Sequence, residues 1–237
     1  MRRVTSLELL DGGLLSQDEI DGNLADLWRA NRYLGGISSS LRLLNLIFRR
    51  TGKRRVRVLE VGAGDGRLAA RLRRELRRQR IEAEFFVLDL RLGHLVAGGA
   101  TAEDLHPVAG DVLSLPFAKG AFDVVTCNHL LHHFSDDLAL RCLRNLARVA
   151  REAVLINDIE RHWLPYLLMR LAPWIWRARV SRLDSVASIR QAYTCPELAG
   201  IATAGGFTDF EVHRMIPYRL GLLLWKSASA RPDGAGA

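Results

Sequence analysis

The chain has few cysteines, and this shortage argues against folds that depend on disulfides or on structural zinc. Its 237 residues include three cysteines, Cys127, Cys142 and Cys195, an odd number with no C-x-x-C spacing. Neither a disulfide framework nor a structural zinc site is expected, and the pattern is typical of a reduced, cytoplasmic chain. A chain of this length buries enough surface to fold without either device.

Targeting and membrane-spanning patterns are also lacking. The first residues, MRRVTSLELLDGG, carry acids within their apolar part, unlike a signal peptide. The most apolar stretch, residues 163–176, contains two prolines and Arg170, and it is too short to cross a bilayer. No transmembrane helix is expected.

Lysine is scarce as well, so that positive charge comes almost wholly from arginine. The formal net charge is +8, and only Lys53, Lys119 and Lys226 are lysines among the 34 basic residues. The densest run, RLRRELRRQR at 71–80, falls on an expected helix. It is either a solvated helix face or a contact for a polyanion. Because no aromatics are interleaved with these arginines, nucleic acid is not the favoured partner.

What the sequence does have is a glycine-rich turn between a strand and a helix, VRVLEVGAGDGRLA at 56–69. Such a turn lets a ligand lie against bare backbone at a helix N-terminus. Arg67 stands where the dinucleotide pattern G-x-G-x-x-G needs its third glycine. Glu60, two residues before the first glycine, would repel a pyrophosphate and attract a cation such as an α-ammonium or sulfonium group. The charge therefore argues against a dinucleotide.

Three further motifs place polar groups after expected strands. An acid at the tip of the second strand, Asp89 in FVLDL, can accept hydrogen bonds from both ribose hydroxyls. Asp111, in AGDVLSLPF, can accept from an adenine amino group between apolar neighbours. The run FDVVTCNHLLHHF delivers polar groups at the end of a buried strand, where open parallel sheets bind ligands.

In order and spacing, VLEVGAGDGR, FVLDL, AGDVLSLPF and FDVVTCNHLLHHF resemble the four motifs of class I S-adenosylmethionine-dependent methyltransferases. The resemblance is strong over residues 56–158 and implies S-adenosylmethionine as the cofactor. Glu60, Gly62 and Gly64 would meet its methionine end, Asp89 its ribose, Asp111 and Val112 its adenine, and Asn128 would lie beneath its sulfonium. The predicted cofactor-binding residues are Glu60, Gly62, Ala63, Gly64, Asp89, Leu90, Gly110, Asp111, Val112 and Asn128, together with Arg32 from the N-terminal segment.

Three other residues of the motifs can be explained by a structural role instead of a ligand contact. Gly66 serves either the ligand or helix–strand packing. Asp65 is either a helix N-cap or a ligand contact. Asp123 is expected to cap its strand, because its motif position does not face the ligand in the family.

The alternation of apolar runs with helical periodicity from residue 56 onward predicts an α/β fold. We expect a Rossmann-like, doubly wound, seven-stranded sheet, mostly parallel with an antiparallel last strand. The expected strands are 56–61, 84–89, 107–109, 122–127, 153–158, 207–214 and 218–225. The expected helices are 66–80, 91–97, 136–150 after an N-cap at Ser135, and one from Thr194 to the glycines at 205–206.

Two segments lie outside this alternation. Residues 1–50 predict an N-terminal helical cover, broken at Gly35 and Gly36, ahead of a methyltransferase domain at 51–226. Residues 160–192 form a long insertion predicted to be a helical lid. The tail at 227–237 has the composition of a disordered segment.

Candidate catalytic groups cluster after the fourth and fifth strands. Methyl transfer needs an aligned nucleophile and, for a hydroxyl acceptor, a base. His132 and His133 could supply that base, shape the substrate or serve structure only. Asp158 is the carboxylate candidate for orienting an acceptor. A metal site that includes His129 is not expected, because no carboxylate cluster accompanies these histidines.

The acceptor is expected to be small and hydrophobic. Residues 163–176 offer an apolar surface that is either a packed helix or a lid over such an acceptor. Interspersed arginines could also seat this lid on an anionic membrane face. Arg32 is predicted to reach the cofactor's carboxylate.

The outer segments resemble bacterial methyltransferases of secondary metabolism that act on phenolic polyketides or quinones. The predicted function is therefore methylation of a phenolic or quinone-like acceptor at oxygen, with carbon or nitrogen open. The fourth motif lacks the Asn/Asp-Pro-Pro-aromatic tetrad of enzymes that methylate amino groups of nucleic acids. Two alternatives remain: a protein or RNA target, or a non-catalytic cofactor-binding partner subunit. The oligomeric state is open.

Overall fold

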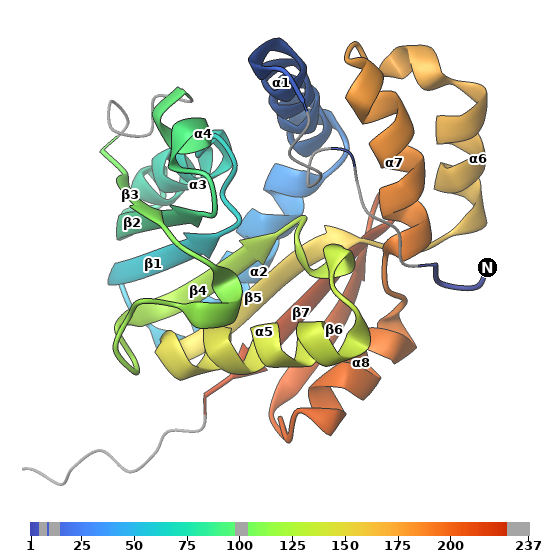
Figure 1. The fold of residues 1–237 in the computed structure, drawn as a ribbon. Coiled ribbons are helices and arrows are strands. Elements are labelled where there is room, and N and C mark those ends of the chain that lie inside the picture. The colour runs from blue at the N-terminus through green and yellow to red at the C-terminus, as the bar shows by residue number, and fades with distance from the viewer. Residues whose placement is uncertain (5–8, 10–14, 98–103, 227–237) are drawn as a thin grey trace, which may run out of the picture.

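A seven-stranded sheet with helices on both faces forms the body of the chain in the computed structural model, which describes residues 1–4, 9, 15–97 and 104–226 (Figure 1). The strand order is β3-β2-β1-β4-β5-β7-β6, and β7 runs antiparallel to both of its neighbours. The strands are β1 Arg55–Val61, β2 Glu82–Asp89, β3 His106–Ala109, β4 Phe122–Asn128, β5 Ala150–Ile159, β6 Phe210–Met215 and β7 Arg219–Trp225. The predicted doubly wound sheet with an antiparallel last strand is confirmed.

The helices follow the predicted order. They are α1 Gln17–Tyr33, α2 Gly36–Thr51, α3 Arg67–Arg78, α4 Leu92–Ala97, α5 Asp136–Val149, α6 Trp163–Leu171, α7 Arg179–Gln191 and α8 Cys195–Ala204, with 3-10 turns η2 Val112–Ser114, η3 Leu131–His133 and η4 Pro173–Ile175. Ser135 caps α5 as expected, accepting from the backbone N–H of Leu138. Thr194 and Glu197 form a capping box at the start of α8.

Where bounds differ from the prediction, backbone geometry gives the reason. Helix α3 ends two residues early because Arg80 has a φ of 60°. Strand β7 starts one residue late because Tyr218 has a φ of 49° in the preceding turn. Strand β6 starts three residues late because the N–H of Phe207 bonds to the carbonyl of Ala202 and closes α8.

Alternate residues of the central strands face two buried apolar clusters, as the period of a strand requires. Val58 packs with α2 and α3 on one face of the sheet, whereas Leu59 packs with α5 and α8 on the other. Strand β4 is buried along its whole length. The sheet is therefore a rigid platform covered on both sides.

The arginine-rich run lies mainly on a solvated face of α3. Leu72 and Leu76 are fully buried, whereas Arg74, Arg77 and Arg78 are exposed. Both interpretations of the run predict an exposed face, so the choice between solvent and a polyanion stays a prediction.

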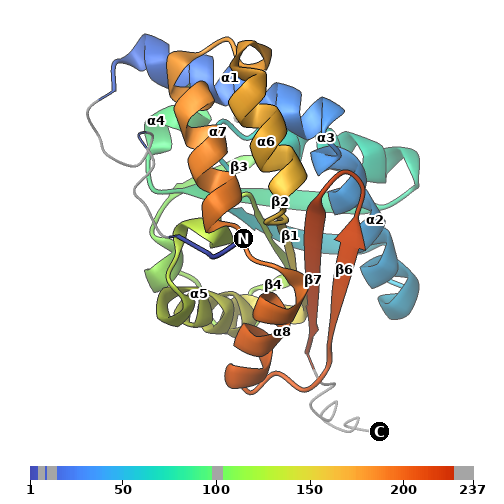
Figure 2. The ribbon, with the colours of Figure 1, turned by 90° about the vertical axis from the view of Figure 1, so that its right-hand side faces the viewer.

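The remaining helices gather beyond the carboxyl ends of the strands (Figures 1 and 2). Helix α1 packs against α2 and α7, and α7 packs against α6. The break between α1 and α2 falls at the predicted glycines, with Gly35 at a φ of 80°. The segment 160–192 carries α6 and α7, and the predicted tail at 227–237 lies outside the described residues. Within the described ranges, no helix combines the length and apolarity that crossing a bilayer requires.

Candidate active site

The glycine turn between β1 and α3 depends on a backbone that only glycine adopts easily. Gly62, Gly64 and Gly66 have φ values of 63°, 58° and 76°. A Cβ on Gly62 would also lie 2.8 Å from Cδ2 of Leu130. Gly66 is the N-cap residue of α3, and the Asp65 carboxylate accepts from the N–H of Arg67 at 3.0 Å. Asp65 therefore serves the start of the helix, close to its predicted capping role.

The first three motifs meet at one edge of the sheet. The N–H of Ala63 bonds to the carbonyl of Leu88 at 3.1 Å, and the N–H of Gly64 bonds to Oδ2 of Asp89 at 2.8 Å. The N–H of Gly110 bonds to the carbonyl of Asp89 at 3.0 Å. Asp89 thus links the glycine turn to the end of β3, and its carboxylate keeps acceptor capacity for a further ligand.

The predicted adenine-binding residues come directly after the end of β3 in the sequence. Asp111 is exposed, and its Oδ1 caps η2 by accepting from the N–H of Leu113 at 2.8 Å. Val112 is buried, and Leu90 is exposed next to Asp89. Gly110 fits closely, since a Cβ there would lie 2.9 Å from Cδ1 of Leu88.

A buried polar network lies beside the glycine turn, at the ends of β1, β4 and β5. Nδ2 of Asn128 donates to Oε1 of Glu60 at 3.1 Å, and Oδ1 of Asn128 accepts from Oγ of Ser40 at 2.8 Å. Nδ2 of Asn157 donates to Oγ of Ser40 at 2.7 Å and to the carbonyl of Gly36 at 3.0 Å. The network ties α2 to both strands.

Glu60 has spare binding capacity in this network. Its Oε2 is buried without a hydrogen-bond partner among the described residues. Burial, opposed by the Asn128 bond and aided by Asp65, raises the pKa of Glu60 to about 8. An orphaned buried carboxyl oxygen suits a cationic ligand, as the charge argument from the sequence predicts. We name Glu60, the glycine turn and Asp89 together the glycine corner. These residues fit a ligand with a positively charged end and a ribose.

His132 and Asp158 form a buried pair at the ends of β4 and β5. Nδ1 of His132 lies 2.6 Å from Oδ1 of Asp158, and the N–H of His132 donates to Oδ2 at 3.1 Å. Burial alone would raise the pKa of Asp158, but attraction to His132 and the hydrogen bonds it accepts outweigh burial and hold that pKa well below its usual range. In the tautomer that carries its proton on Nδ1, His132 donates that proton to Asp158, and Nε2 is then the basic atom. Both carboxylate oxygens of Asp158 therefore hold His132, and the predicted role of Asp158 toward an acceptor stays a prediction.

The other two histidines are placed differently. The ring of His133 lies against that of His132, with centroids 4.3 Å apart. Nε2 of His129 meets the guanidinium of Arg219, which is itself buried. Burial first, and then the charge of Arg219, hold the pKa of His129 well below its usual range. A neutral His129 that accepts from an arginine is a poor general base.

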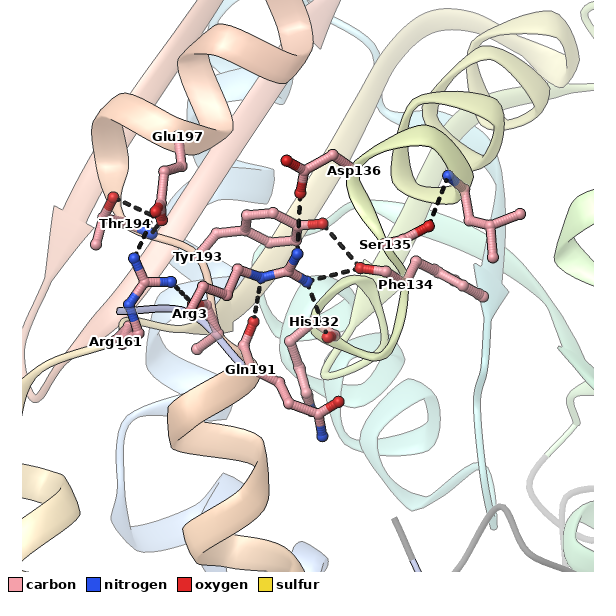
Figure 3. A network of polar contacts seen from close by, with 12 residues as sticks. Arg3, His132, Phe134, Ser135, Asp136, Arg161, Gln191, Tyr193, Thr194 and Glu197 are labelled. Carbon is pink, nitrogen blue, oxygen red and sulfur yellow. Dashed lines mark hydrogen bonds and ion pairs between the residues drawn. The ribbon is translucent and has the colours of Figure 1, made fainter. Parts of the chain in front are cut away.

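The N-terminal residues cross this site and are tied to it by Arg3 (Figure 3). Its guanidinium donates to the carbonyl oxygens of Gln191 at 2.6 Å, Phe134 at 2.6 Å and His132 at 3.3 Å. It also pairs with Asp136 at 2.9 Å and lies 3.8 Å from the centroid of the Tyr193 ring. Residues 1–4, named here the N-terminal strap, therefore join the histidine turn η3 to the end of α7.

Arg32 and Asp123 complete the predicted positions. Arg32 is exposed on the last turn of α1, beside the ring of Tyr33, so its reach to a cofactor stays a prediction. Asp123 lies at the opposite, amino-terminal end of β4, where it accepts from Lys53 at 2.6 Å and from the N–H of Arg57 at 2.9 Å. Its structural role is as expected.

Sequence reasoning missed several groups that complete the site. They are Ser40 from α2, Arg219 from β7 and Arg3 from the N-terminal strap. A weak signal exists for Arg219, because it opens an otherwise apolar strand. Ser40 and Arg3 carry no such signal, since their partners are 88 and 131 residues away in the chain.

Comparison with known proteins agrees with the motifs. Residues 58–153 match the family described as a methyltransferase domain. Together with the sheet order and the glycine corner, this match defines the class. Residues 58–153 thus form a methyltransferase domain of the class I S-adenosylmethionine-dependent type, a family whose cofactor is S-adenosylmethionine.

Particular relatives are more distant. The chain is 30% identical to the demethylmenaquinone methyltransferase of Thermobifida fusca over 154 residues, which are 61% of this chain and 64% of that protein. It is 46% identical to the demethylmenaquinone methyltransferase of Mycolicibacterium vanbaalenii over 134 residues, 51% of this chain and 57% of that protein. The match thus spans less than two thirds of these relatives' length.

A solved structure shares the fold. A SAM-dependent methyltransferase from Aquifex aeolicus superposes with a TM-score of 0.59 at 16% identity, covering 82% of this chain and 92% of that one. At this identity the likeness shows the shared architecture.

Proposed function

We propose that this chain transfers a methyl group from S-adenosylmethionine to a small hydrophobic acceptor that carries an acidic hydroxyl, of the phenol or hydroquinone type. The observation that carries the proposal is the buried His132–Asp158 pair, held at the carboxyl end of the sheet beside the Glu60–Asn128 network. A base beside a cation-binding corner is what methylation of a hydroxyl requires.

The glycine corner supplies the cofactor contacts. S-adenosylmethionine, when bound, supplies an activated methyl group on a sulfonium that is already a good leaving group. The carboxyl of Glu60 would face its positively charged end, Asp89 the ribose hydroxyls, and Asp111 the adenine. Asn128 would hold Glu60 in place through its amide while its own position at the end of β4 faces the same corner.

The His132–Asp158 pair handles the proton. Nε2 of His132 takes the proton from the acceptor hydroxyl, which leaves an oxyanion as the nucleophile. The negative charge of Asp158 stabilises the imidazolium that forms. The proton then leaves to solvent once the methylated product departs.

The nature of the acceptor is argued from its surroundings and from the relatives. Helix α7 of the insertion packs against the histidine turn η3, so this part of the insertion lies next to His132. The relatives named above act, by their names, on demethylmenaquinone, a quinone. A deprotonated hydroquinone is nucleophilic at oxygen and at the neighbouring ring carbon. We propose oxygen, and the mass of fragments of the product distinguishes the two.

The test is a transfer assay with methyl-labelled S-adenosylmethionine against a panel of phenols, hydroquinones and polyketide-like phenolics. Each product is identified by mass spectrometry. We expect turnover with at least one apolar phenol or hydroquinone, and a deep loss of turnover in His132→Ala but not in the control His213→Asn on β6. Cofactor binding without turnover on any acceptor would instead support a non-catalytic partner subunit. Labelling of protein or RNA in a cell extract would support a macromolecular target.

A further inference from the structure

The insertion after β5 exposes an unusual amount of apolar surface. Helix α6 has no buried residue, so it is not a packed core helix. Trp163 is 59% exposed, Trp174 is 73% exposed, and Leu171 and Ile175 are exposed with them. Several large apolar side chains exposed on one segment indicate an interaction site.

A second exposed apolar turn adjoins α6. The ring of His162, at the start of α6, lies 4.7 Å from that of Tyr218 in the turn between β6 and β7. In Figure 2 the α6 helix lies above this turn. Ile216 in that turn is 91% exposed. We name these exposed residues the apolar rim: Trp163, Leu168, Leu171, Trp174, Ile175 and Ile216.

The apolar rim is joined to the candidate site through the end of β5. Helix α6 starts four residues after Ile159, the last residue of β5, whose Asp158 holds His132. On the other side, Pro217 lies 2.9 Å from where a Cβ of Gly35 would be, in the turn that joins α1 to α2. Next to this turn, Tyr33 and Leu34 are also exposed.

The charge on the insertion itself is almost wholly positive. Between residues 161 and 192 the sequence has six arginines and one acid, Asp184. That acid is buried, and it accepts from the N–H of Leu9 at 3.0 Å. Five of the arginines are exposed: Arg170, Arg177, Arg179, Arg182 and Arg190. The surface of the insertion is therefore apolar and cationic.

We propose that the apolar rim docks on an anionic lipid bilayer. Tryptophans and leucines would enter the interface while the arginines contact acidic headgroups, the combination that binds peripheral helices to membranes. The tryptophan side chains suit the boundary between headgroups and acyl chains. A bilayer, unlike a protein partner, needs no shape complementarity to this convex helix. Docking would bring the side of the molecule that carries the His132–Asp158 pair close to the membrane. An acceptor dissolved in lipid could then enter without crossing water.

The experiment measures partition of the full chain onto vesicles by sedimentation. We expect binding to vesicles of phosphatidylcholine with phosphatidylglycerol, and much weaker binding to pure phosphatidylcholine or in high salt. Trp174→Ser with Ile175→Ser should weaken binding by about tenfold or more. Arg177→Gln with Arg179→Gln should weaken it by about fivefold per arginine.

The matched control removes the same charge elsewhere. Arg77→Gln with Arg78→Gln on α3 should bind like the wild type, because the rest of the surface is unchanged. Equal binding of the wild type and the Trp174/Ile175 variant would overturn the proposal. So would a dimer, seen by sedimentation equilibrium without lipid, that this variant dissociates, because the rim would then be a protein interface.

Activity is read separately. The apolar-rim variants should keep the turnover of the wild type on a water-soluble phenol, since their residues lie outside the His132 pair and the glycine corner. Vesicle binding thus tests docking even if the proposed reaction proves wrong, and the reaction can be tested without vesicles.

Discussion

The proposed cofactor end and the proposed acceptor end of the candidate active site are held by different kinds of contact. At the cofactor end, Gly62, Gly64 and Asp89 are fixed by the glycine turn and by the ends of adjacent parallel strands. At the acceptor end, His132 is held by Asp158 from β5 and by the N-terminal strap, whose Arg3 bonds to residues more than a hundred positions away. The cofactor end therefore depends on short sequence motifs. The acceptor end depends on contacts between segments that are distant in the sequence.

The sharpest test of this contrast is the loss of the base. His132→Ala should lower kcat by about 10²–10⁴-fold, the usual contribution of a positioned general base. Its affinity for S-adenosylmethionine, measured by calorimetry, should stay within about twofold of the wild type, because the His132 pair does not hold the glycine turn. His129→Asn is a control of similar location, since a neutral His129 takes no proton. An unchanged kcat in His132→Ala would show that His132 is not the general base.

At the cofactor end, Asp89→Ala should mainly change binding. It removes the acceptor of the Gly64 N–H and the acceptor proposed for the ribose, so that affinity for S-adenosylmethionine should fall by about 100-fold. Calorimetry with the cofactor and with its demethylated product measures the change. Glu84→Gln, an exposed acid on the same strand, should bind normally. Wild-type affinity in Asp89→Ala would remove this residue from the site.

The pH dependence of stability isolates Glu60. Because the folded protein keeps a proton on Glu60 up to about pH 8 while the unfolded chain releases it near pH 4.5, stability should fall as the pH rises between these values. The slope would be at most about 1.4 kcal/mol per pH unit. Denaturant unfolding of the wild type and of Glu60→Gln across pH 5–8 should show this slope in the wild type only.

The same group links cofactor binding to proton release. A cationic ligand favours the ionised form of Glu60, so affinity for S-adenosylmethionine should rise with pH up to about pH 8. The Glu60→Gln variant should bind more weakly, by about tenfold, and with a flat pH profile. Parallel pH profiles for the two proteins would show that Glu60 does not meet the cation.

The smallest expected effect belongs to the N-terminal strap. Arg3→Ala removes a guanidinium that donates to three carbonyl oxygens, and it should lower kcat by a few-fold while leaving cofactor affinity unchanged. A positioning role predicts that the pH profile of kcat also shifts, which simple loss of stability would not cause. Arg2→Ala, at an exposed neighbouring residue, is the matched control.

The same contrast explains what the sequence could predict. The order and type of the strands and helices, the Ser135 cap and the capping box at Thr194 follow from short-range patterns. The link from Ser40 to Asn128 and the burial of Arg219 do not, because each depends on how α2 and β7 pack against strands distant in sequence. The three histidines looked alike in the sequence, and only their neighbours in space separate them.

The reach of Arg3 has a consequence for biosynthesis. Its acceptors include Gln191, 188 residues further along the chain. On the ribosome, this arginine emerges early, and its partners His132, Phe134 and Asp136 follow much later. Its contact with Gln191 can form only after α7 has been translated. The N-terminal strap would therefore fasten the histidine turn only after α7 has emerged, whereas the glycine turn can meet Asp89 as soon as β2 has been translated.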